Sequence, residues 1–537
     1  MRLWVKSNNQ IAIALIILLL FSFCLNTCGI WWGLPSFSGW AADELIPLRV
    51  LEGMEKGFSN GWHYKYPPVH FYILAVLYSP VWLLHKLNII DIYSLPAYTF
   101  LFYIGRFLTV FMGSALLLII YLCGLEIYDR KSSFFAVLIT ALSVPLIYYS
   151  KTINLEVPYL LWVMLSLLFY LKLLKHHRLK DYLLFALTAT IAVCTKDQAY
   201  AFYLLTPIFI IVEHHRYQKQ DNPELTLKDS LKDKRIILSL AVGIGAFLLL
   251  HNIIFNLPGF LKHVKLITAG GGSIRPRYEQ SIIGQLQMFR QTLTHLRFSL
   301  GWPTYIMCLL GFTSILYRLK NNYLLASLLV PTISYYLFYV CVVWYNNVRY
   351  LMPLAIILAL YGGKFLGEFL NPEKTLFKAK AILVTTLFVY TFAYGFSVNI
   401  LMMQDSRYYV EQWMQQNIDK NALIVNTGGN KYSPRLDNFR SEDVDAPSLE
   451  LLSTKKPEYV IVSSGYDIRR FEKNAPEYAF FDNLNKEIDY KLVLKYQSQP
   501  KWNLFDRQEL SYRDLDKMYI YSNIDKINPE IKIFKRK

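Results

Sequence analysis

The chain has 537 residues, of which 54% are hydrophobic and only 18% are charged, so it is too apolar for an ordinary soluble enzyme. Its formal net charge of +17 does not indicate a nucleic-acid-binding protein, because the Lys and Arg residues fall largely in short clusters between apolar runs. This composition predicts a polytopic membrane protein whose basic loops set its topology.

The first apolar run, Ile11 to Ile30, is long enough to cross the hydrocarbon core, which takes about 20 helical residues. Arg2 and Lys6 precede it, as basic residues precede the apolar part of a signal peptide. No small-residue cleavage pattern follows, and Trp31 and Trp32 are typical of a membrane interface. We therefore expect a retained first transmembrane helix.

Further candidate spans follow at residues 98–124, 134–150, 157–174, 182–195, 198–213, 236–256, 298–317, 323–343, 350–367 and 380–398. Basic clusters in alternate loops fall on the same side as the N-terminus, and the positive-inside rule makes that side cytoplasmic. About eleven spans then place the C-terminus outside. The segment Pro67 to Leu84 is also apolar, but its insertion would invert every later loop. We therefore expect it to be a juxtamembrane helix that lies in the interface.

From about Asn399 the sequence changes to that of a soluble domain. A helix is predicted over Asp405 to Ile418, and short buried strands are predicted at 422–425, 459–462, 490–494 and 518–521. About 140 residues suffice for a small α/β domain. The sequence thus predicts a mainly α fold, with a transmembrane domain over residues 1–398 and an extracytoplasmic α/β domain over residues 399–537.

The first external loop carries an adjacent acidic pair, Asp43 and Glu44. Adjacent side chains on a helix point about 100° apart, so only one of the two would face a given substrate atom. The pair also fits a simpler role at the start of a helix, where the helix dipole favours acidic residues. A catalytic role is favoured because the topology delivers other charged groups to the same external side.

These other groups come from separate loops. Glu156 begins a span at its external end, and Lys196 lies in a very short turn between two apolar segments, where an ammonium group needs a partner or an aqueous cavity. Arg349 ends an aromatic external turn and has the planar geometry to bind a phosphate through two hydrogen bonds. Arg106 lies inside a predicted span, and Lys65 shortly precedes a double proline. Each also fits an ordinary role as a helix start, an interfacial cation or a structural ion pair.

The motifs occur in the order Asp43-Glu44, Tyr66-Pro67-Pro68, Gly105-Arg106, Asn154-Leu155-Glu156, Thr195-Lys196 and Arg349-Tyr350-Leu351-Met352-Pro353. In order and topology they resemble the C-type membrane glycosyltransferases that use polyprenyl-phosphate sugars, such as protein O-mannosyltransferases and lipid A aminoarabinose transferases. Two positions depart from that pattern. The second-loop acid, often Asp in the family, is Glu156. The lysine that directly precedes the prolines in aminoarabinose transferases is replaced by Tyr66, with Lys65 one residue earlier.

The resemblance implies an inverting transfer of a sugar from a polyprenyl phosphate to an external lipid, glycan or protein. It implies that Asp43 is the catalytic carboxylate and that Glu44 and Glu156 are the other acidic site residues. The implied ligands of the donor and its phosphate are Lys65, Lys196, Arg349, Tyr350 and Arg106. The residue types agree with this chemistry, because sugar transfer needs a carboxylate to take the acceptor's proton and cations to stabilise the departing phosphate.

No metal or other cofactor is predicted to be required. A divalent ion that bridges Asp43, Glu156 and phosphate is an alternative, but the external loops contain no dense acidic cluster. The pairs His176-His177 and His214-His215 lack ligand spacing. The six cysteines indicate neither a disulfide framework nor a zinc site.

The resulting hypothesis is a multi-pass transferase of a bacterial or archaeal plasma membrane, surrounded by membrane lipids. Two alternatives stay open. A transporter or flippase of lipid-linked sugars predicts inverted repeats and ionisable groups near the membrane midplane. A non-catalytic assembly subunit predicts that the C-terminal domain carries the function and that single changes at Asp43, Lys196 or Arg349 leave activity intact.

Overall fold

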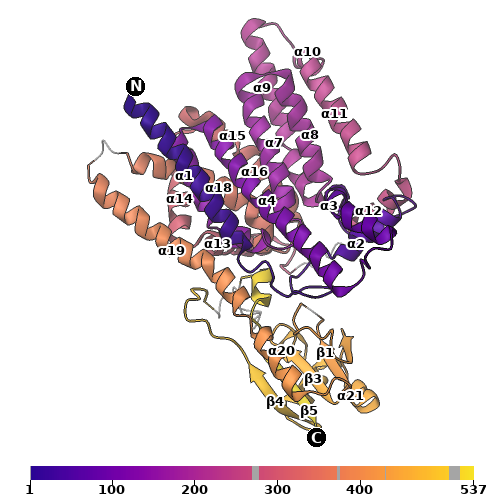
Figure 1. Cartoon of the computed structure of the whole chain (residues 1–537). Helices are drawn as coiled ribbons and strands as arrows, with labels where there is room; N and C mark the ends of the chain where they lie inside the picture. Colours follow the sequence, from indigo (N-terminus) through magenta and orange to yellow (C-terminus); the bar gives the residue numbers. More distant parts are fainter. Residues whose placement is uncertain (1, 269–276, 372–374, 430, 507–519) are drawn as a thin grey trace. The chain divides into compact units, whose positions relative to one another are not determined.

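The computed structural model describes residues 2–268, 277–371, 375–429, 431–506 and 520–537 (Figure 1). The described chain packs as two compact units. The helical unit comprises Met1–Thr27, Pro47–Ile89 and Ile104–Gly395. The C-terminal unit comprises Cys28–Ile46, Ile90–Tyr103 and Phe396–Lys537, so it includes parts of the predicted first external loop as well as the region of the predicted soluble domain.

Helices make up most of the described chain (Figure 1). In the first half they are α1 (Arg2–Thr27), α2 (Pro47–Glu55), α3 (Val69–Lys86), α4 (Leu95–Ile127), α5 (Arg130–Ala141), α6 (Val144–Tyr149), α7 (Glu156–His176), α8 (Leu179–Val193), α9 (Thr206–Asp221), α10 (Leu227–Leu231), α11 (Lys234–Leu250) and α12 (Leu257–Thr268). They continue as α13 (Ile282–Leu300), α14 (Trp302–Leu316), α15 (Tyr323–Ser327), α16 (Leu329–Tyr335), α17 (Cys341–Val343), α18 (Met352–Phe369) and α19 (Phe377–Met403).

Within the described residues, five helical segments are long and apolar enough to cross a membrane, or seven if each of two bent helix pairs is one span. The helices α8, α9 and α11 have 15, 16 and 17 residues. At about 1.5 Å per residue they fall short of a hydrocarbon core of ~30 Å. The mainly helical, multi-pass architecture is therefore confirmed, while the number of eleven spans stays a prediction.

The helices that lead to the charged loop residues are closely packed in the helical unit. The helix α7 is hydrophobic all round, and its side chains are buried along its length. The helices α5 and α18 approach closely at Gly363, where an added Cβ would lie 2.6 Å from the carbonyl oxygen of Ser132. Small residues of this kind let helix backbones pack against each other in membrane proteins.

In the C-terminal unit, the described residues form a five-stranded sheet in the order β2-β1-β3-β5-β4. The strands are β1 (Ile424–Thr427), β2 (Ser441–Val444), β3 (Tyr459–Ser463), β4 (Tyr490–Tyr496) and β5 (Ile531–Arg536). The strand β1 pairs in parallel with β2 and β3, whereas β5 is antiparallel to both β3 and β4. The result is a mixed sheet with a parallel half and an antiparallel half.

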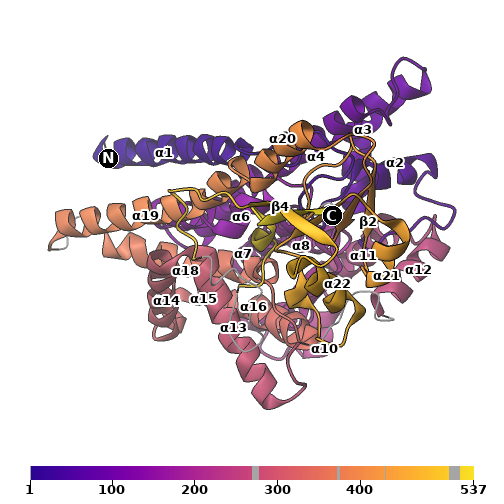
Figure 2. The ribbon, with the colours of Figure 1, turned by 90° about the horizontal axis from the view of Figure 1, so that it is seen from below.

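Helices cover both faces of this sheet. The helix α20 (Ser406–Asn417) packs Val410 and Met414 against Ile461 and Ile533 on one face (Figure 1). On the other face, α21 (Leu449–Lys455) and α22 (Pro476–Asn485), both visible in Figure 2, pack against the sheet and contact each other. The C-terminal unit thus contains the small α/β arrangement that the sequence predicts.

The strands differ from the prediction in three places. The strand β2 (Ser441–Val444) lies in a stretch where no strand is predicted. The basic tail of the chain is the strand β5, because Ile531, Ile533 and Phe534 are buried against the sheet while lysines alternate with them. In the predicted strand over 518–521, residues 518 and 519 lie outside the described residues, and Ile520 and Tyr521 are buried but not in a strand.

Candidate active site

One carboxylate in the helical unit is contacted by two cations. The Nζ of Lys196 lies 2.8 Å from Oε1 of Glu156, and Nη1 of Arg349 lies 3.7 Å from the same oxygen. The Lys196, Glu156 and Arg349 side chains are 9%, 2% and 17% exposed, so this cationic cluster is largely removed from water. The structure thus brings together three of the residues that the sequence singles out from separate loops.

Each member of the cationic cluster comes from the end of a helical segment. Glu156 is the first residue of α7, and Lys196 directly precedes the 3-10 helix η1 (Asp197–Tyr203). Arg349 lies in the 3-10 helix η4 (Val348–Leu351), where its N–H donates a hydrogen bond of 3.1 Å to the side chain of Asn347. The apolar helix bodies fix these polar ends in place.

Aromatic rings lie against the two cations. The Nζ of Lys196 is 5.1 Å from the ring centre of Tyr159, and the guanidinium carbon of Arg349 is 5.3 Å from the ring centre of Tyr350. The Tyr335 hydroxyl donates a hydrogen bond of 2.8 Å to the carbonyl of Tyr350. Ring faces attract cations and also provide apolar surface. The environment therefore suits a ligand with both an anionic and an apolar part.

The cationic cluster contains more cations than carboxylates. Among its three members, one carboxylate faces two cations in a mostly buried place. Burial has the largest effect on the pKa of Lys196 and lowers it, and the Glu156 carboxylate does not fully restore the ordinary value. Two cations placed together in this way can bind an anion such as a phosphate through charged hydrogen bonds.

Two other predicted site residues, Lys65 and Arg106, lie in the helical unit close to segments that lead to the cationic cluster. The Nζ of Lys65 is 4.9 Å from the ring centre of Tyr66, shortly before α3, and the first N–H of α3 donates to the carbonyl of Cys194, two residues before Lys196. Arg106 is fully buried in α4. Its neighbour Gly105 lies against Ile153, three residues before Glu156.

The acidic pair belongs to the C-terminal unit. Asp43 is exposed and has a φ of 60°, in the left-handed region that Asp tolerates better than most residues. Glu44 is buried, and its N–H donates to the carbonyl of Ala41. The helix α2 begins only at Pro47, so both acids lie before the helix that the simpler role would assign to them.

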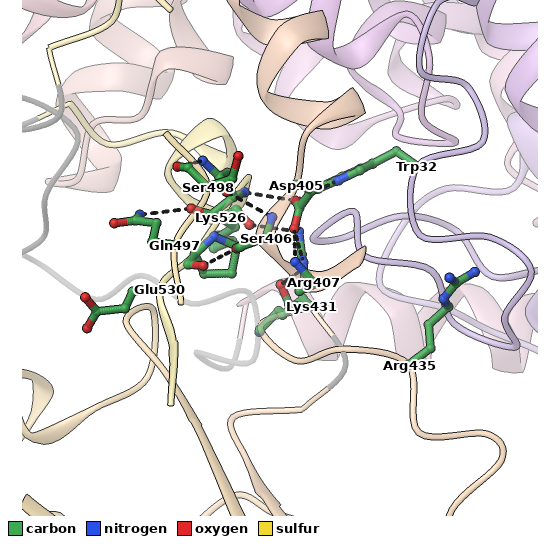
Figure 3. Close-up of polar contacts among 12 residues, drawn as sticks. Trp32, Asp405, Ser406, Arg407, Lys431, Arg435, Gln497, Ser498, Lys526 and Glu530 are labelled. Atoms are coloured by element: carbon green, nitrogen blue, oxygen red, sulfur yellow. Dashed lines mark hydrogen bonds and ion pairs between the residues drawn. The ribbon is translucent and has the colours of Figure 1, made fainter. Parts of the chain in front are cut away.

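The loop that carries Asp43 is held by buried groups of the same unit. The indole N–H of Trp32 donates a hydrogen bond of 2.9 Å to Asp405, which also forms an ion pair of 2.7 Å with Arg407 (Figure 3). The guanidinium of Arg407 lies 4.1 Å from the ring centre of Trp40. Asn523 donates to the carbonyl of Ala42, next to Asp43. The C-terminal domain therefore fixes the backbone on which the proposed catalytic acid stands.

Sequence reasoning missed a second polar group in the helical unit. A carboxylate oxygen of Asp197 and one ring nitrogen each of His251 and His263 lie within 4.8 Å of one another. Burial alone lowers the pKa of His263, but the hydrogen bond to Asp197 and its charge raise that pKa above the ordinary value. No spacing motif connects the three residues. The predicted span over 236–256 also enclosed His251, whereas α11 ends at Leu250 and His251 follows it as the C-cap.

Comparisons with known proteins agree with the predicted resemblance. A family model described as dolichyl-phosphate-mannose-protein mannosyltransferase matches residues 101–227, which include Arg106, Glu156 and Lys196. A comparison with curated protein sequences gives no match.

Solved structures extend the likeness to nearly the whole chain. The archaeal oligosaccharyltransferase AglB from Archaeoglobus fulgidus, in complex with an inhibitory peptide and a dolichol-phosphate, has a TM-score of 0.50 at 10% identity, over 99% of this chain and 89% of that chain. ArnT from Cupriavidus metallidurans bound to undecaprenyl phosphate has a TM-score of 0.48 at 10% identity, over 97% of both chains. At such identity the likeness to AglB concerns the fold. Together with the family match, it confirms the predicted resemblance to the C-type membrane glycosyltransferases.

Proposed function

We propose that this protein transfers one sugar from a polyprenyl-phosphate donor to an extracytoplasmic lipid, glycan or protein, with inversion at the anomeric carbon. The observation that carries the proposal is the cationic cluster, in which Lys196 and Arg349 share one oxygen of Glu156. Its two cations, its burial and its aromatic surroundings suit a lipid-linked phosphate. The dolichol-phosphate in the AglB complex supports the same class of donor.

In the proposed reaction, the acceptor hydroxyl attacks the anomeric carbon from the face opposite the phosphate. The new bond from carbon to the acceptor oxygen forms as the bond to the phosphate oxygen breaks, and the lipid phosphate leaves with an additional negative charge. Lys196 and Arg349 stabilise that charge as it develops. Glu156 then acts as a positioning residue, because its carboxylate is occupied by both cations.

Asp43 is the proposed base that takes the acceptor's proton. Its exposure and its backbone, fixed next to Ala42 and Trp40, support a reactive role, whereas Glu44 is buried and supports the loop. Lys65, Arg106 and Tyr350 are proposed donor-binding residues. Of these, Tyr350 has the most direct support, because its ring lies against the guanidinium of Arg349.

We further propose that the chain lies in a plasma membrane, with a cytoplasmic N-terminus, a transmembrane domain over residues 1–398 and an extracytoplasmic domain over residues 399–537. The side assignment can be tested in intact cells with a cysteine introduced at an exposed position of the C-terminal domain, for example by Trp502→Cys. Labelling by a membrane-impermeant thiol reagent is expected, and labelling only after lysis would contradict it.

The function itself is tested with purified protein and a panel of radiolabelled polyprenyl-phosphate sugars, offered with envelope lipid, glycan and peptide acceptors. Transfer from at least one lipid-linked donor is expected, and NMR of the product should show an anomeric configuration opposite to that of the donor. Retention of configuration, or transfer only from nucleotide sugars, would contradict the proposal.

A further inference from the structure

The second polar group, Asp197, His251 and His263, joins three separate segments of the helical unit. Asp197 is the first residue of η1, His251 follows α11, and His263 lies in the middle of α12. Both histidines are buried, whereas the Asp197 side chain is 30% exposed. The cluster is therefore enclosed on the histidine side and reachable from solvent on the carboxylate side.

The surrounding backbone is held by a second set of hydrogen bonds. Asn252 and Asn256 donate to the carbonyl of Phe58, and Asn256 also donates to the carbonyl of Trp62. An added Cβ at Gly259 would lie 2.2 Å from the carbonyl oxygen of Trp62, so only glycine fits at this close approach. The first-loop segment before α3 is thus fixed against the corner between α11 and α12.

His263 faces an oxygen acceptor at each ring nitrogen. Its Nδ1 lies 2.7 Å from the carbonyl oxygen of Tyr64, and its Nε2 lies 3.1 Å from Oδ1 of Asp197. Without a bound cation, an imidazolium ring can donate to both acceptors. With a cation bound, the proton lies on Nδ1, and the lone pair of Nε2 and the Asp197 carboxylate both face the cation. An imidazole that donates its remaining N–H to a backbone carbonyl is the usual orientation of a histidine bound to a metal.

His251 supplies an independent observation. Its side chain is 94% buried, since 6% is exposed, and no described residue meets its Nδ1 with a hydrogen bond. A buried polar atom without a partner costs about 1–3 kcal/mol. The rings of His251 and His263 have their centres 5.4 Å apart at an angle of 50°, so two imidazoles stand side by side next to one carboxylate.

We propose that Asp197, His251 and His263 bind a divalent cation of the zinc class, with water or a further oxygen ligand at the fourth position. Two imidazoles and one carboxylate are a donor set that zinc uses in tetrahedral sites with one open position. Ligand atoms at about 2.0–2.2 Å from one zinc lie roughly 3.3–3.6 Å apart. The separations here reach at most 4.8 Å, so side-chain shifts of the order of 1 Å form the site.

A cation at this position connects parts of the proposed transferase site. Asp197 directly follows Lys196 of the cationic cluster, and Tyr64 directly precedes Lys65. The cation would therefore fix the turn that presents Lys196 and the first-loop segment that leads to α3. Metal binding itself does not depend on the proposed transfer reaction, so it is tested without a sugar donor.

The test uses the full-length protein purified through an affinity tag that contains no histidine, stripped with EDTA and dialysed. Wild-type protein is expected to bind one Zn²⁺ per chain by elemental analysis, and to give the intense visible absorption of tetrahedral Co²⁺. The variants Asp197→Asn and His263→Gln should lower the Zn²⁺ affinity at least about tenfold. The matched control is His215→Gln, because His215 is half-buried and makes one hydrogen bond, to Ser230, outside this cluster.

X-ray absorption of the zinc-loaded wild type keeps the test independent of how the variants fold. Two imidazole ligands and oxygen ligands are expected. The proposal is overturned if the wild type binds no stoichiometric zinc, if the bound zinc has no imidazole ligand, or if His215→Gln lowers the affinity as much as His263→Gln does.

Discussion

Arg349→Met removes one of the two cations from the cationic cluster. The remaining Glu156 and Lys196 still form an ion pair of 2.8 Å, so the variant should fold while it loses one positive charge. The methionine keeps an unbranched apolar side chain against the ring of Tyr350. The substitution therefore separates the charge of Arg349 from its packing.

The expected loss follows from the interaction of one guanidinium with one phosphate. A hydrogen bond between charged partners contributes about 1.5–3 kcal/mol. Two unit charges about 4 Å apart near a protein surface interact by about 4 kcal/mol. We therefore expect the Kd for undecaprenyl phosphate to rise roughly 10- to 1000-fold. Tritiated undecaprenyl phosphate, bound to the protein in nanodiscs, gives this Kd directly.

Two comparisons make the result specific. Arg349→Lys should lie between the wild type and Arg349→Met, because it keeps the charge but loses the planar fork. Arg290→Met is the matched control, since Arg290 is an exposed arginine of α13. An unchanged Kd in Arg349→Met, or an equal loss in Arg290→Met, would refute the assignment of the cationic cluster to the lipid phosphate.

Two further predictions concern the C-terminal unit. Asp405→Asn leaves the buried Arg407 without its carboxylate, which costs about 3–5 kcal/mol, and hydrogen exchange should rise across residues 28–46; unchanged exchange there would show that the ion pair does not hold the loop. Burial raises the pKa of Asp525 from 3.8 to about 6, so the folded state is most stable when this group is protonated and loses stability as the pH rises from about 4 to 6. Asp525→Asn should therefore raise the thermal midpoint at pH 7.5, by removing a cost of up to about 3 kcal/mol, and should match the wild type near pH 4; the reverse order would contradict the burial argument.

Long apolar helices and their polar starts could be predicted from the sequence. The span predicted over 157–174 is α7, and the helix predicted from Asp405 is α20, with Asp405 as its N-cap. Hydrophobic length and capping residues are local properties, so they survive in the fold. The topology argument likewise singled out Glu156, Lys196 and Arg349. The predicted topology places the ends of their helices on one side of the membrane, so their charged side chains are expected there together.

Features that depend on tertiary contacts, or on a short break within a helix, were not predicted. The predicted span over 134–150 is broken into α5 and α6, with Pro145 near the start of α6, as expected where proline cannot continue a helix. The strand β5 was not predicted, because three of its six residues are Lys or Arg. The group around His263 could not be predicted, because its ligand-type residues are far apart in sequence and meet only through the packing of α11, α12 and η1.

The role of the C-terminal domain also became visible only in the structure. No sequence motif connects the loop of residues 28–46 with α20, yet Trp32 and Trp40 contact Asp405 and Arg407. A catalytic carboxylate needs a backbone that holds it within about 0.5 Å of its working position. For the proposed base Asp43, the buried ion pair beside Trp40 is a physical means by which the C-terminal unit holds the loop.

The central claim is that Asp43 takes the acceptor's proton during sugar transfer. Its most direct test is the kcat of purified Asp43→Asn with the donor and acceptor found for the wild type, measured beside the Kd for undecaprenyl phosphate. A general base contributes about 10²–10⁴-fold, so kcat should fall by at least about 100-fold while the Kd stays unchanged. A variant that transfers sugar at the wild-type rate would contradict the claim.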